Sequence, residues 1–553
     1  MRKCLTTLWH RGGNMKLSSI YSNGMILQRG VQNKIRGSFD NEEVITVSFD
    51  GKALSVVQDS DNHLWTASIP SMNAGGPYSL IVEVNGEKIE EITDILIGDV
   101  FVLGGQSNME LPLIWTTDYH YDEIRSADFD KIRQFEVPKI PLFGKKDEIL
   151  NGGTWVNADQ EHIDNFSAIG FYFAKYKFLN DGIPVGLVQT AVGGAPVESL
   201  MSEENLRSSF ERIEPEYIHS GKCNQDKSKG CLWCYKEKLQ KYSDMEYVQS
   251  VIRDDFARMD SWHKDVDDND PGLTSDWKEK WPETDTYETF TMPQTFYQTK
   301  YEDFKGSIWL QKTVDVPDSW CDKEVELRLG TLMDADTTFV NGTPVGGFCF
   351  KYPPRRYFLK PGLLHPGENT ITIRLVIDTN IGGAVKECPY YLKLDDQKID
   401  LTGTWNMRIA YKTGNLESQT FFNWSPTALY NSMLHPIRDL SCKAILFYQG
   451  ESNCEYPQYY APLLKDMVTE WRVLFGEKTP FYMAEITYWL GDGPVYESDP
   501  FDGVRKVQHE VINDIPDAYL IPTYDLGMYN DLHPQNKKEV AMRFLEQYNE
   551  NEK

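Results

Sequence analysis

The stretch Ile95-Leu-Ile-Gly-Asp-Val-Phe-Val-Leu-Gly-Gly-Gln-Ser107-Asn-Met-Glu110 decides the fold. Residues 100–103 are apolar, a pattern typical of a strand buried on both faces. Gly104 and Gly105 permit a sharp turn, after which a short helix can begin until Pro112 interferes. Ligands bind at the carboxyl ends of parallel strands, so Ser107 is a candidate acyl-transfer nucleophile. The alternative is a serine that caps a helix after a glycine turn.

Two further stretches favour a catalytic site. Ala444-Ile-Leu-Phe-Tyr-Gln-Gly-Glu-Ser-Asn453 is another apolar strand run, and it breaks at Gly450 into polar groups. Asp525-Leu-Gly-Met-Tyr-Asn-Asp-Leu-His533-Pro places a histidine just before residues 537–548, whose apolar side chains recur at helical spacing. An early serine, amides after a later strand and a late histidine together indicate a serine hydrolase site.

These motifs resemble, in this order, those of the sialate O-acetylesterase family, which belongs to the SGNH (GDSL-type) hydrolases. The resemblance rests on Gly-Gln-Ser107-Asn-Met-Glu, Tyr-Gln-Gly-Glu-Ser-Asn453 and Asp-Leu-His533-Pro. It extends over nearly the whole chain and is weakest from about residue 202 to residue 299. It implies an α/β fold with a flavodoxin-like parallel sheet and helices on both faces. It also implies a serine esterase that removes O-acetyl groups from carbohydrate.

The resemblance assigns the nucleophile to Ser107 and the general base to His533. Ser452 competes for the first role, because Gly-Glu-Ser452-Asn shares the pattern around Ser107. The carboxylate of Glu451 beside Ser452 would oppose a developing oxyanion, whereas Ser107 has the neutral neighbours Gln106 and Asn108. Ser107 is therefore the predicted nucleophile. Gln106, Asn108 and Glu451 are the predicted substrate-binding or site-ordering residues.

Four groups are predicted to form the oxyanion hole. The resemblance implies the backbone amides of Ser107 and Gly194, and the side-chain amides of Gln449 and Asn453. The turn Gly193-Gly194 can bring backbone N–H groups close to a substrate oxygen. The alternatives are an ordinary tight loop for the glycines and turn capping for the two amide side chains.

Two interpretations are possible for the third catalytic residue, the one that would orient His533. Family members carry an aspartate three residues before the histidine, but Asn530 occupies that position here and Asp531 follows it. Asp531 supplies the charge that would stabilise an imidazolium at His533, and it is the predicted third member. The alternative is that Asp531 caps the following helix, and that a backbone carbonyl orients His533 in a Ser-His dyad.

The chain is expected to divide into five segments, with a catalytic domain that is interrupted in sequence. Period-two alternation and turn signals predict β-structure on both sides of the first catalytic segment. The second β segment resembles the jelly-roll modules of β-galactosidases, and it either binds sugar or only packs. Trp262, Trp277 and Trp281 either stack on sugar rings or pack internally. The segments are residues 17–94 (β-sandwich-like), 95–201 (catalytic, first part), 202–300 (mixed helical insert), 301–426 (jelly-roll insert) and 427–553 (catalytic, second part).

Composition restricts the partners. The chain has 553 residues and a formal net charge of −27, which argues against nucleic acid and anionic membranes as partners. No apolar run is long enough for a membrane span, and no signal-peptide h-region follows Met1, so a cytoplasmic location is expected. Met15 is an alternative start. The expected partner is an acetylated sugar, either sialic acid or a plant or host glycan, and the oligomeric state stays open.

The expected chemistry requires no metal and no organic cofactor. Cys223, Cys231 and Cys234, with His219, could form a zinc site, but reduced cysteines in a surface insert are the simpler interpretation. Two alternatives to a sialate esterase remain at this point. One is an acetyl-xylan or other carbohydrate acetylesterase, and the other is a catalytically silent carbohydrate-binding protein.

Overall fold

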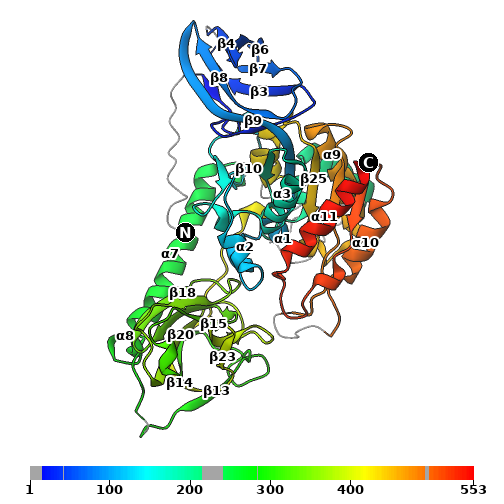
Figure 1. The fold of residues 1–553 in the computed structure, drawn as a ribbon. Helices are drawn as coiled ribbons and strands as arrows, with labels where there is room; N and C mark the ends of the chain where they lie inside the picture. Colours follow the sequence, from blue (N-terminus) through cyan, green and yellow to red (C-terminus); the bar gives the residue numbers. More distant parts are fainter. Residues whose placement is uncertain (1–14, 41–42, 214–240, 283, 492–496, 553) are drawn as a thin grey trace.

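The computed structural model describes residues 15–40, 43–213, 241–282, 284–491 and 497–552. Figure 1 shows three parts in a row: N-terminal β-sheets, a central α/β part and a second β part at the other end. The long helix α7 (Met245–Asp268) runs from beside the α/β part to the second β part. His219, Cys223, Cys231 and Cys234, the candidate zinc ligands, lie outside the described residues.

The central sheet is built from both catalytic segments. Its strands run parallel except for the antiparallel edge strand β11, and β9 lies between β12 and β25. Two chain segments far apart in sequence thus meet at β9, and the carboxyl end of β9 is where ligands are expected in such a sheet. The order is β11 (Trp155–Ala158), β10 (Phe129–Glu136), β12 (Val185–Gln189), β9 (Glu87–Gly105), β25 (Ala444–Tyr448), β26 (Phe481–Ala484) and β27 (Ala518–Ile521).

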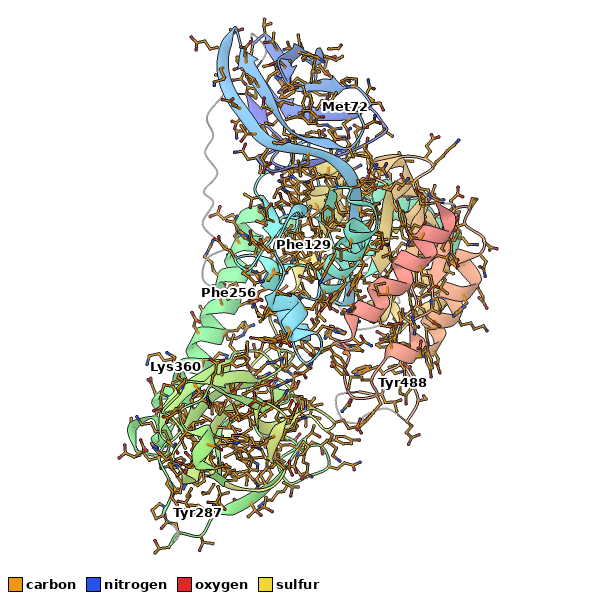
Figure 2. The ribbon with its side chains drawn as sticks, in the orientation of Figure 1. Met72, Phe129, Phe256, Tyr287, Lys360 and Tyr488 are labelled. Carbon is orange, nitrogen blue, oxygen red and sulfur yellow. The ribbon has the colours of Figure 1, made fainter. Side chains whose placement is uncertain are left out.

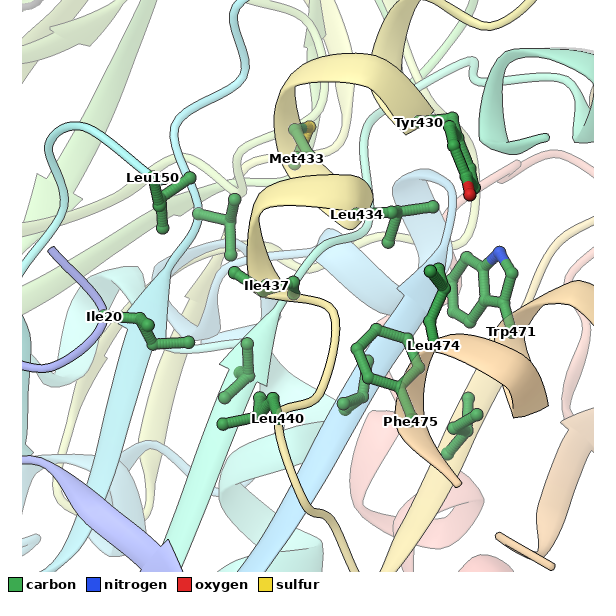
Figure 3. Packing of buried hydrophobic residues seen from close by; sticks show 14 of the residues in the cluster. Ile20, Leu150, Tyr430, Met433, Leu434, Ile437, Leu440, Trp471, Leu474 and Phe475 are labelled. Atoms are coloured by element: carbon green, nitrogen blue, oxygen red, sulfur yellow. The ribbon is translucent and has the colours of Figure 1, made fainter. Parts of the chain in front are cut away.

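Helices cover both faces of this sheet, as predicted. Val100 and Val102 of β9 belong to one buried cluster, and Phe101 and Leu103 belong to another, because successive strand side chains point to opposite faces. The cluster with Val100 includes Trp471 and Phe475 of one helix, which Figure 3 shows against the loop that contains Leu440. The covering helices are α9 (Pro457–Phe475) and α10 (Asp502–Ile512) on this face, and α3 (Ala168–Asp181) and α11 (Lys537–Asn551) on the other.

Two glycines allow the end of β9 to approach its neighbours closely. A Cβ on Gly104 would lie 2.5 Å from the Trp471 ring, and one on Gly105 would lie 2.1 Å from the carbonyl oxygen of Tyr448. Gly105 also has a φ of 120°, which side chains disfavour. The predicted sharp turn is present, and α1 (Ser107–Glu110) follows it and ends before Pro112.

The N-terminal β part and the central sheet share one strand. The first half of β9 pairs with β8 (Gly75–Val84) and β2 (Ile26–Gln28), and the second half joins the central sheet. The expected boundary at residue 95 therefore falls inside a continuous strand. Hairpins occur at Asp50-Gly51 and Asn85-Gly86 as predicted. The remaining strands are β1 (Lys16–Leu17), β3 (Asn33–Ser38), β4 (Ile45–Phe49), β5 (Lys52–Ala53), β6 (Ser55–Asp59) and β7 (Leu64–Ile69).

The second β part has two main antiparallel sheets around one core. Its six-stranded sheet includes β13 (Glu288–Met292), which lies before the expected start at residue 301. The predicted hairpin at Asn341-Gly342 joins β17 to β18. The sheets are β13, β24 (Gly403–Lys412), β14 (Gly306–Val316), β20 (Gly367–Ile377), β17 (Ala335–Val340) and β18 (Thr343–Phe348), then β19 (Arg356–Leu359), β15 (Val325–Leu329), β22 (Tyr390–Leu394) and β23 (Gln397–Asp400), and the small pair β16 (Leu332–Met333) and β21 (Gly383–Ala384).

The segment between the central α/β part and the second β part is mainly helical where the structure describes it. Helix α4 (Glu203–Ile213) packs on α9, and α8 (Pro271–Thr274) precedes the second β part. The guanidinium of Arg408 lies over the rings of Trp277 and Trp281. The indole N–H of Trp262 donates to the carbonyl of Gly414. Trp281 is buried, which agrees with internal packing, whereas Trp262 and Trp277 are half-buried. Among the described helices, none is both long and apolar enough to cross a membrane.

Candidate active site

Ser107 is the first residue of α1, directly after the end of β9. Its side chain is partly exposed, and its hydroxyl forms no hydrogen bond with any described residue. A Cβ on Gly193 would lie 3.8 Å from the Cβ of Ser107, so the glycine turn after β12 borders this serine. The hydroxyl is therefore presented at the edge of the sheet where three strand ends meet.

The glycine turn is held from both sides. Glu110 Oε2 accepts the backbone N–H of Gly193, and Lys139 Nζ lies 2.5 Å from Glu110 Oε1. Although burial opposes its charge, Glu110 and Glu136 raise the pKa of Lys139 to about 12. Trp424 Nε1 donates to the Gly193 carbonyl at 2.8 Å. These contacts fix the direction of the peptide groups on either side of Gly193.

This arrangement leaves two amides beside the serine. Within the described part of the chain, the backbone N–H groups of Ser107 and Gly194 donate to no acceptor. A Cβ on Gly194 would lie 2.4 Å from the Trp424 ring, and its φ is 73°. Gly194 is thus required both by its backbone conformation and by the indole packed on it. Two unpaired N–H groups next to a hydroxyl are what an oxyanion hole needs.

The competing serine is already engaged. Ser452 Oγ donates to the carbonyl of Gly194 at 2.9 Å, and the Ser452 backbone N–H donates to Gln106 Oε1 at 3.2 Å. Gln106 Oε1 also accepts from the backbone of Gly450. The side chain of Gln106 therefore joins the ends of β9 and β25. Ser452 acts as a support for the glycine turn in this geometry.

The side chains of Gln449 and Asn453 belong to a buried hydrogen-bond network, and their amide groups bond to other residues of that network. Gln449 Nε2 donates to Asn453 Oδ1 at 2.7 Å and to the carbonyl of Ala195 at 3.2 Å. Asn453 Nδ2 donates to Glu198 Oε2 at 2.9 Å. Both amides thus connect β25 to the loop after β12. Their assignment to the oxyanion hole stays a prediction.

A second buried network contains Asn108 and Glu451, and it includes a lysine that sequence analysis missed. Asn108 Nδ2 donates to Glu451 Oε1 at 2.6 Å and to the carbonyl of Leu532 at 3.2 Å. Lys537 Nζ donates to Asn108 Oδ1 at 2.6 Å. Burial raises the pKa of Glu451 and lowers that of Lys537 to about 8. Because Asn108 follows Ser107 and Leu532 precedes His533, this network holds the two candidate catalytic residues in neighbouring positions.

His533 is buried, with 6% of its surface exposed. Neither ring nitrogen has a hydrogen-bond partner within the described part of the molecule, so Ser107 and His533 are not hydrogen-bonded in this state. Catalytic hydrogen bonds are often long without substrate and shorten when it binds. Burial, reinforced by the charges of Lys537 and Lys351, lowers the pKa of His533 to about 3. The ring is therefore neutral at pH 7 and able to accept a proton.

Asp531 contacts the backbone of the histidine. Its Oδ1 accepts the backbone N–H of His533 at 2.8 Å. Asn530 points elsewhere, because its Nδ2 donates to the carbonyl of Lys386 at 2.9 Å. This contact is a local turn and not the expected alternative, a cap of the following helix, because α11 begins at Lys537 with Asn536 at its N-cap position. The role of Asp531 as the third catalytic member stays a prediction.

The second β part covers His533. The ring of Tyr352 meets the His533 ring edge to face, with centroids 4.3 Å apart. Phe350 and Tyr352 also contact Trp115, at 5.4 and 6.2 Å between centroids. Arg356 donates to the carbonyl of Thr117 at 2.6 Å. An aromatic wall from the second β part therefore helps to exclude water from the histidine.

Several site residues carried little sequence signal. Lys537 stands in the first turn of α11, where a lysine is unfavourable for the helix dipole, and this was the one available hint. Tyr352 and Trp424 lie in loops far from the motifs in sequence. Glu110 was part of the first motif, but nothing in the sequence indicated that its carboxylate binds the Gly193 amide.

Comparisons with known proteins point to one class of enzyme. Residues 416–549 match the family model described as "Carbohydrate esterase, sialic acid-specific acetylesterase". The chain is 23% identical to sialate O-acetylesterase of Homo sapiens over 214 residues, which are 36% of this chain and 40% of the human protein. It is 24% identical to the Rattus norvegicus protein over 216 residues, 36% of this chain and 39% of that protein. The matched region thus spans about two fifths of these relatives.

The fold is similar to that of a solved enzyme. A crystal structure of a carbohydrate acetylesterase from Xanthomonas citri aligns with a TM-score of 0.53 and 20% sequence identity, covering 96% of this chain and 74% of the other. At this identity the similarity concerns the fold. The family match places residues 416–549, which contain Gln449, Glu451 and His533, in the carbohydrate esterase class of hydrolases.

Proposed function

We propose that this chain, with its carbohydrate esterase segment at residues 416–549, is a serine esterase that removes O-acetyl groups from carbohydrate. The observation that carries the proposal is the grouping at the end of β9. There the unpaired Ser107 hydroxyl lies beside two unpaired backbone amides, and a neutral buried histidine follows on the adjoining loop. This is the set of groups that acyl transfer from an ester requires.

The proposed reaction has two steps. His533 takes the proton from Ser107 Oγ, which attacks the acetyl carbonyl carbon, and the carbonyl oxygen becomes an oxyanion held by the amides of Ser107 and Gly194. His533 then gives the proton to the departing sugar oxygen. In the second step His533 takes a proton from water, the hydroxide attacks the acyl carbon, and acetate leaves as Ser107 regains its proton.

The low pKa of His533 shapes this mechanism. A buried imidazole near Lys351 and Lys537 is a poor site for a second positive charge, so the imidazolium is stable only with an anion beside it. The oxyanion that forms in the same step is that anion. Proton transfer and attack are therefore coupled, because each charge stabilises the other beside a buried histidine.

The supporting residues act through position. Glu110 holds the Gly193 amide and Trp424 holds the Gly193 carbonyl, which fixes the peptide group that carries the Gly194 N–H. Asn108 links the serine helix to Leu532 and to Lys537, and Glu451 completes this link. If β10 and β11 are left out, the order β12, β9, β25, β26, β27 is the 2-1-3-4-5 order of flavodoxin-like sheets, which is in keeping with the SGNH-type fold that we propose. We include Gln449 and Asn453 as supports that keep the loop after β12 in place.

For the substrate, we propose 9-O-acetylated sialic acid, on the basis of the similarity to the sialate O-acetylesterases. An acetyl-xylan or other uncharged acetylated glycan is the second candidate, and a specific contact favours it. Lys139, the lysine beside the glycine turn, is held by two carboxylates and offers no net positive charge to a sialate carboxylate. The two candidates share the reaction and differ in the sugar.

Hydrolysis of defined esters tests the proposal. Purified protein should release acetate from ethyl acetate and faster from an acetylated saccharide, and Ser107→Ala should lose both activities. A panel of 9-O-acetyl sialosides and acetylated xylo-oligosaccharides then identifies the sugar. A wild-type protein without activity on any acetyl ester, but with glycan binding, would instead indicate a silent carbohydrate-binding protein.

A further inference from the structure

A pocket of about 450 Å³ lies beside the candidate catalytic serine. Its size falls in the range of small-molecule sites. One wall comes from α7 and the other from residues 419–424, and Gly193 lies in the lining. Ser107 is not in the lining, but the Cβ position of Gly193 is 3.8 Å from the Cβ of Ser107, so Gly193 lies between the pocket and the proposed nucleophile. The mechanism above assigns this pocket no role.

An aromatic stack leads from the glycine turn into this pocket. The indole of Trp424 packs on Gly194 and donates to the carbonyl of Gly193. The ring of Phe421 stacks on Trp424, with centroids 3.9 Å apart and an angle of 10° between the planes. Phe421 is 41% exposed although it is large and apolar. The stack thus offers an open flat ring within the pocket lining.

The opposite wall is apolar with polar groups at its edge. Met245, Val248, Ile252 and Phe256 recur at helical spacing along α7, so they share one face of that helix. Phe256, labelled in Figure 2, is exposed. The polar lining includes Gln249, Asp255 and Lys139.

We propose that this pocket binds a sugar ring of the acetylated saccharide, with the exposed face of Phe421 as its stacking platform. A pyranose has a flat face of C–H groups and a rim of hydroxyls, which match an exposed aromatic ring and flanking polar side chains. The pocket's position beside Ser107 sets the ring next to the ester that reacts. This inference rests on the proposed esterase function and adds where the sugar lies.

The test compares esters with and without a sugar. For wild type and variants, kcat/KM is measured on an acetylated xylo-oligosaccharide, on a 9-O-acetyl sialoside and on ethyl acetate. Phe421→Ala should lower the ratio of kcat/KM for the preferred saccharide over ethyl acetate by about tenfold, mostly through KM. Phe421→Tyr keeps a flat ring and should restore the ratio. Leu179→Ala, at an exposed apolar side chain outside the pocket, is the matched control.

The outcomes separate this inference from the esterase proposal. A ratio within twofold of wild type for Phe421→Ala on both saccharides overturns the sugar-binding pocket while leaving the esterase intact. If Phe421→Ala does not fold, Phe256→Ala replaces it, and an unchanged ratio for that variant overturns the inference equally. If wild type hydrolyses none of the esters, the esterase proposal fails. The pocket is then tested by titrating Ser107→Ala and Ser107→Ala/Phe421→Ala with the saccharides, and equal affinities overturn it.

Discussion

Replacement of Asp531 by asparagine distinguishes a catalytic triad from a dyad. In the structure the Asp531 carboxylate accepts the backbone N–H of His533 at 2.8 Å, and neither ring nitrogen of His533 has a partner within the described residues. An asparagine keeps an oxygen that can accept the same N–H. The geometry therefore predicts a small effect on catalysis, with kcat within about tenfold of wild type.

The magnitudes for the two readings are far apart. A triad aspartate that stabilises the imidazolium costs about ten-thousandfold in kcat when it becomes asparagine, which corresponds to about 5.4 kcal/mol. A side-chain oxygen that accepts a backbone N–H in a turn contributes about 1 kcal/mol to stability, and this contribution is lost only in Asp531→Ala. Asp531→Ala should therefore lower the midpoint of thermal unfolding, whereas Asp531→Asn should leave it nearly unchanged.

The assay is kcat for acetyl ester hydrolysis, measured beside thermal unfolding for Asp531→Asn, Asp531→Ala and the neighbouring control Asn530→Ala. A loss of a thousandfold or more in kcat for Asp531→Asn, at normal thermal stability, would refute the local-turn interpretation. It would mean that the carboxylate turns to the ring of His533 when substrate binds.

Ser107→Ala should reduce kcat at least about a thousandfold, whereas Ser452→Ala should cost far less, and the reverse order in an ester assay would exchange their roles. The free energy of unfolding should fall as pH drops from 6.5 toward 3, and His533 should contribute about 1.4 kcal/mol per pH unit to this fall. In this range the unfolded state binds a proton at His533 that the folded state does not. Denaturant titrations at several pH values measure the effect, and an equally steep fall in His533→Gln would contradict it. Gly105→Ala should destabilise the fold by several kcal/mol, since its Cβ would collide with backbone, and a thermal unfolding midpoint within 2 °C of wild type would contradict it. Deletion of residues 288–412 should reduce soluble yield and kcat, because it removes the aromatic wall over His533. A soluble variant with unchanged kcat would show that this wall is dispensable.

The parts of the fold that depend on local pattern were predictable from the sequence. The apolar runs at residues 100–103 and 444–448 became the adjacent strands β9 and β25, and the Asn-Gly and Asp-Gly pairs became hairpin turns. The helix before the C-terminus began at Lys537, as its apolar spacing indicated. These features are decided within a few residues, by periodicity and turn chemistry.

The boundaries between parts were not predictable in this way. β9 continues through the expected boundary at residue 95, because both of its halves find partner strands and nothing in their composition separates them. β13 joins the second β part before residue 301, since its pairing with β24 bridges more than a hundred residues of sequence. Long-range pairing of this kind leaves no local signal.

In the candidate site, too, local motifs were predictable from the sequence and long-range contacts were not. The motifs pointed to Ser107 and His533 as candidate catalytic residues, but the contacts that set their environment come from elsewhere in the chain. Lys537 reaches Asn108, Tyr352 contacts His533 and Trp424 packs on Gly194. Each of these contacts joins segments that are distant in sequence, so only the folded chain reveals them.

The position of the charges explains why these distant contacts matter. In the proposed mechanism a neutral serine and a neutral histidine gain opposite charges during attack, and the net negative charge of the protein does not stabilise the oxyanion. In the proposed mechanism the oxyanion is stabilised by the amides of Ser107 and Gly194, and Glu110 and Trp424 fix the peptide groups on either side of Gly193. The Tyr352 ring covers the histidine. Ser107 follows the end of β9, between the ends of β12 and β25, so residues from neighbouring loops can contribute to one site. The second β part contributes Tyr352, whose ring packs against His533, so a residue from outside the central sheet sets the environment of the proposed base.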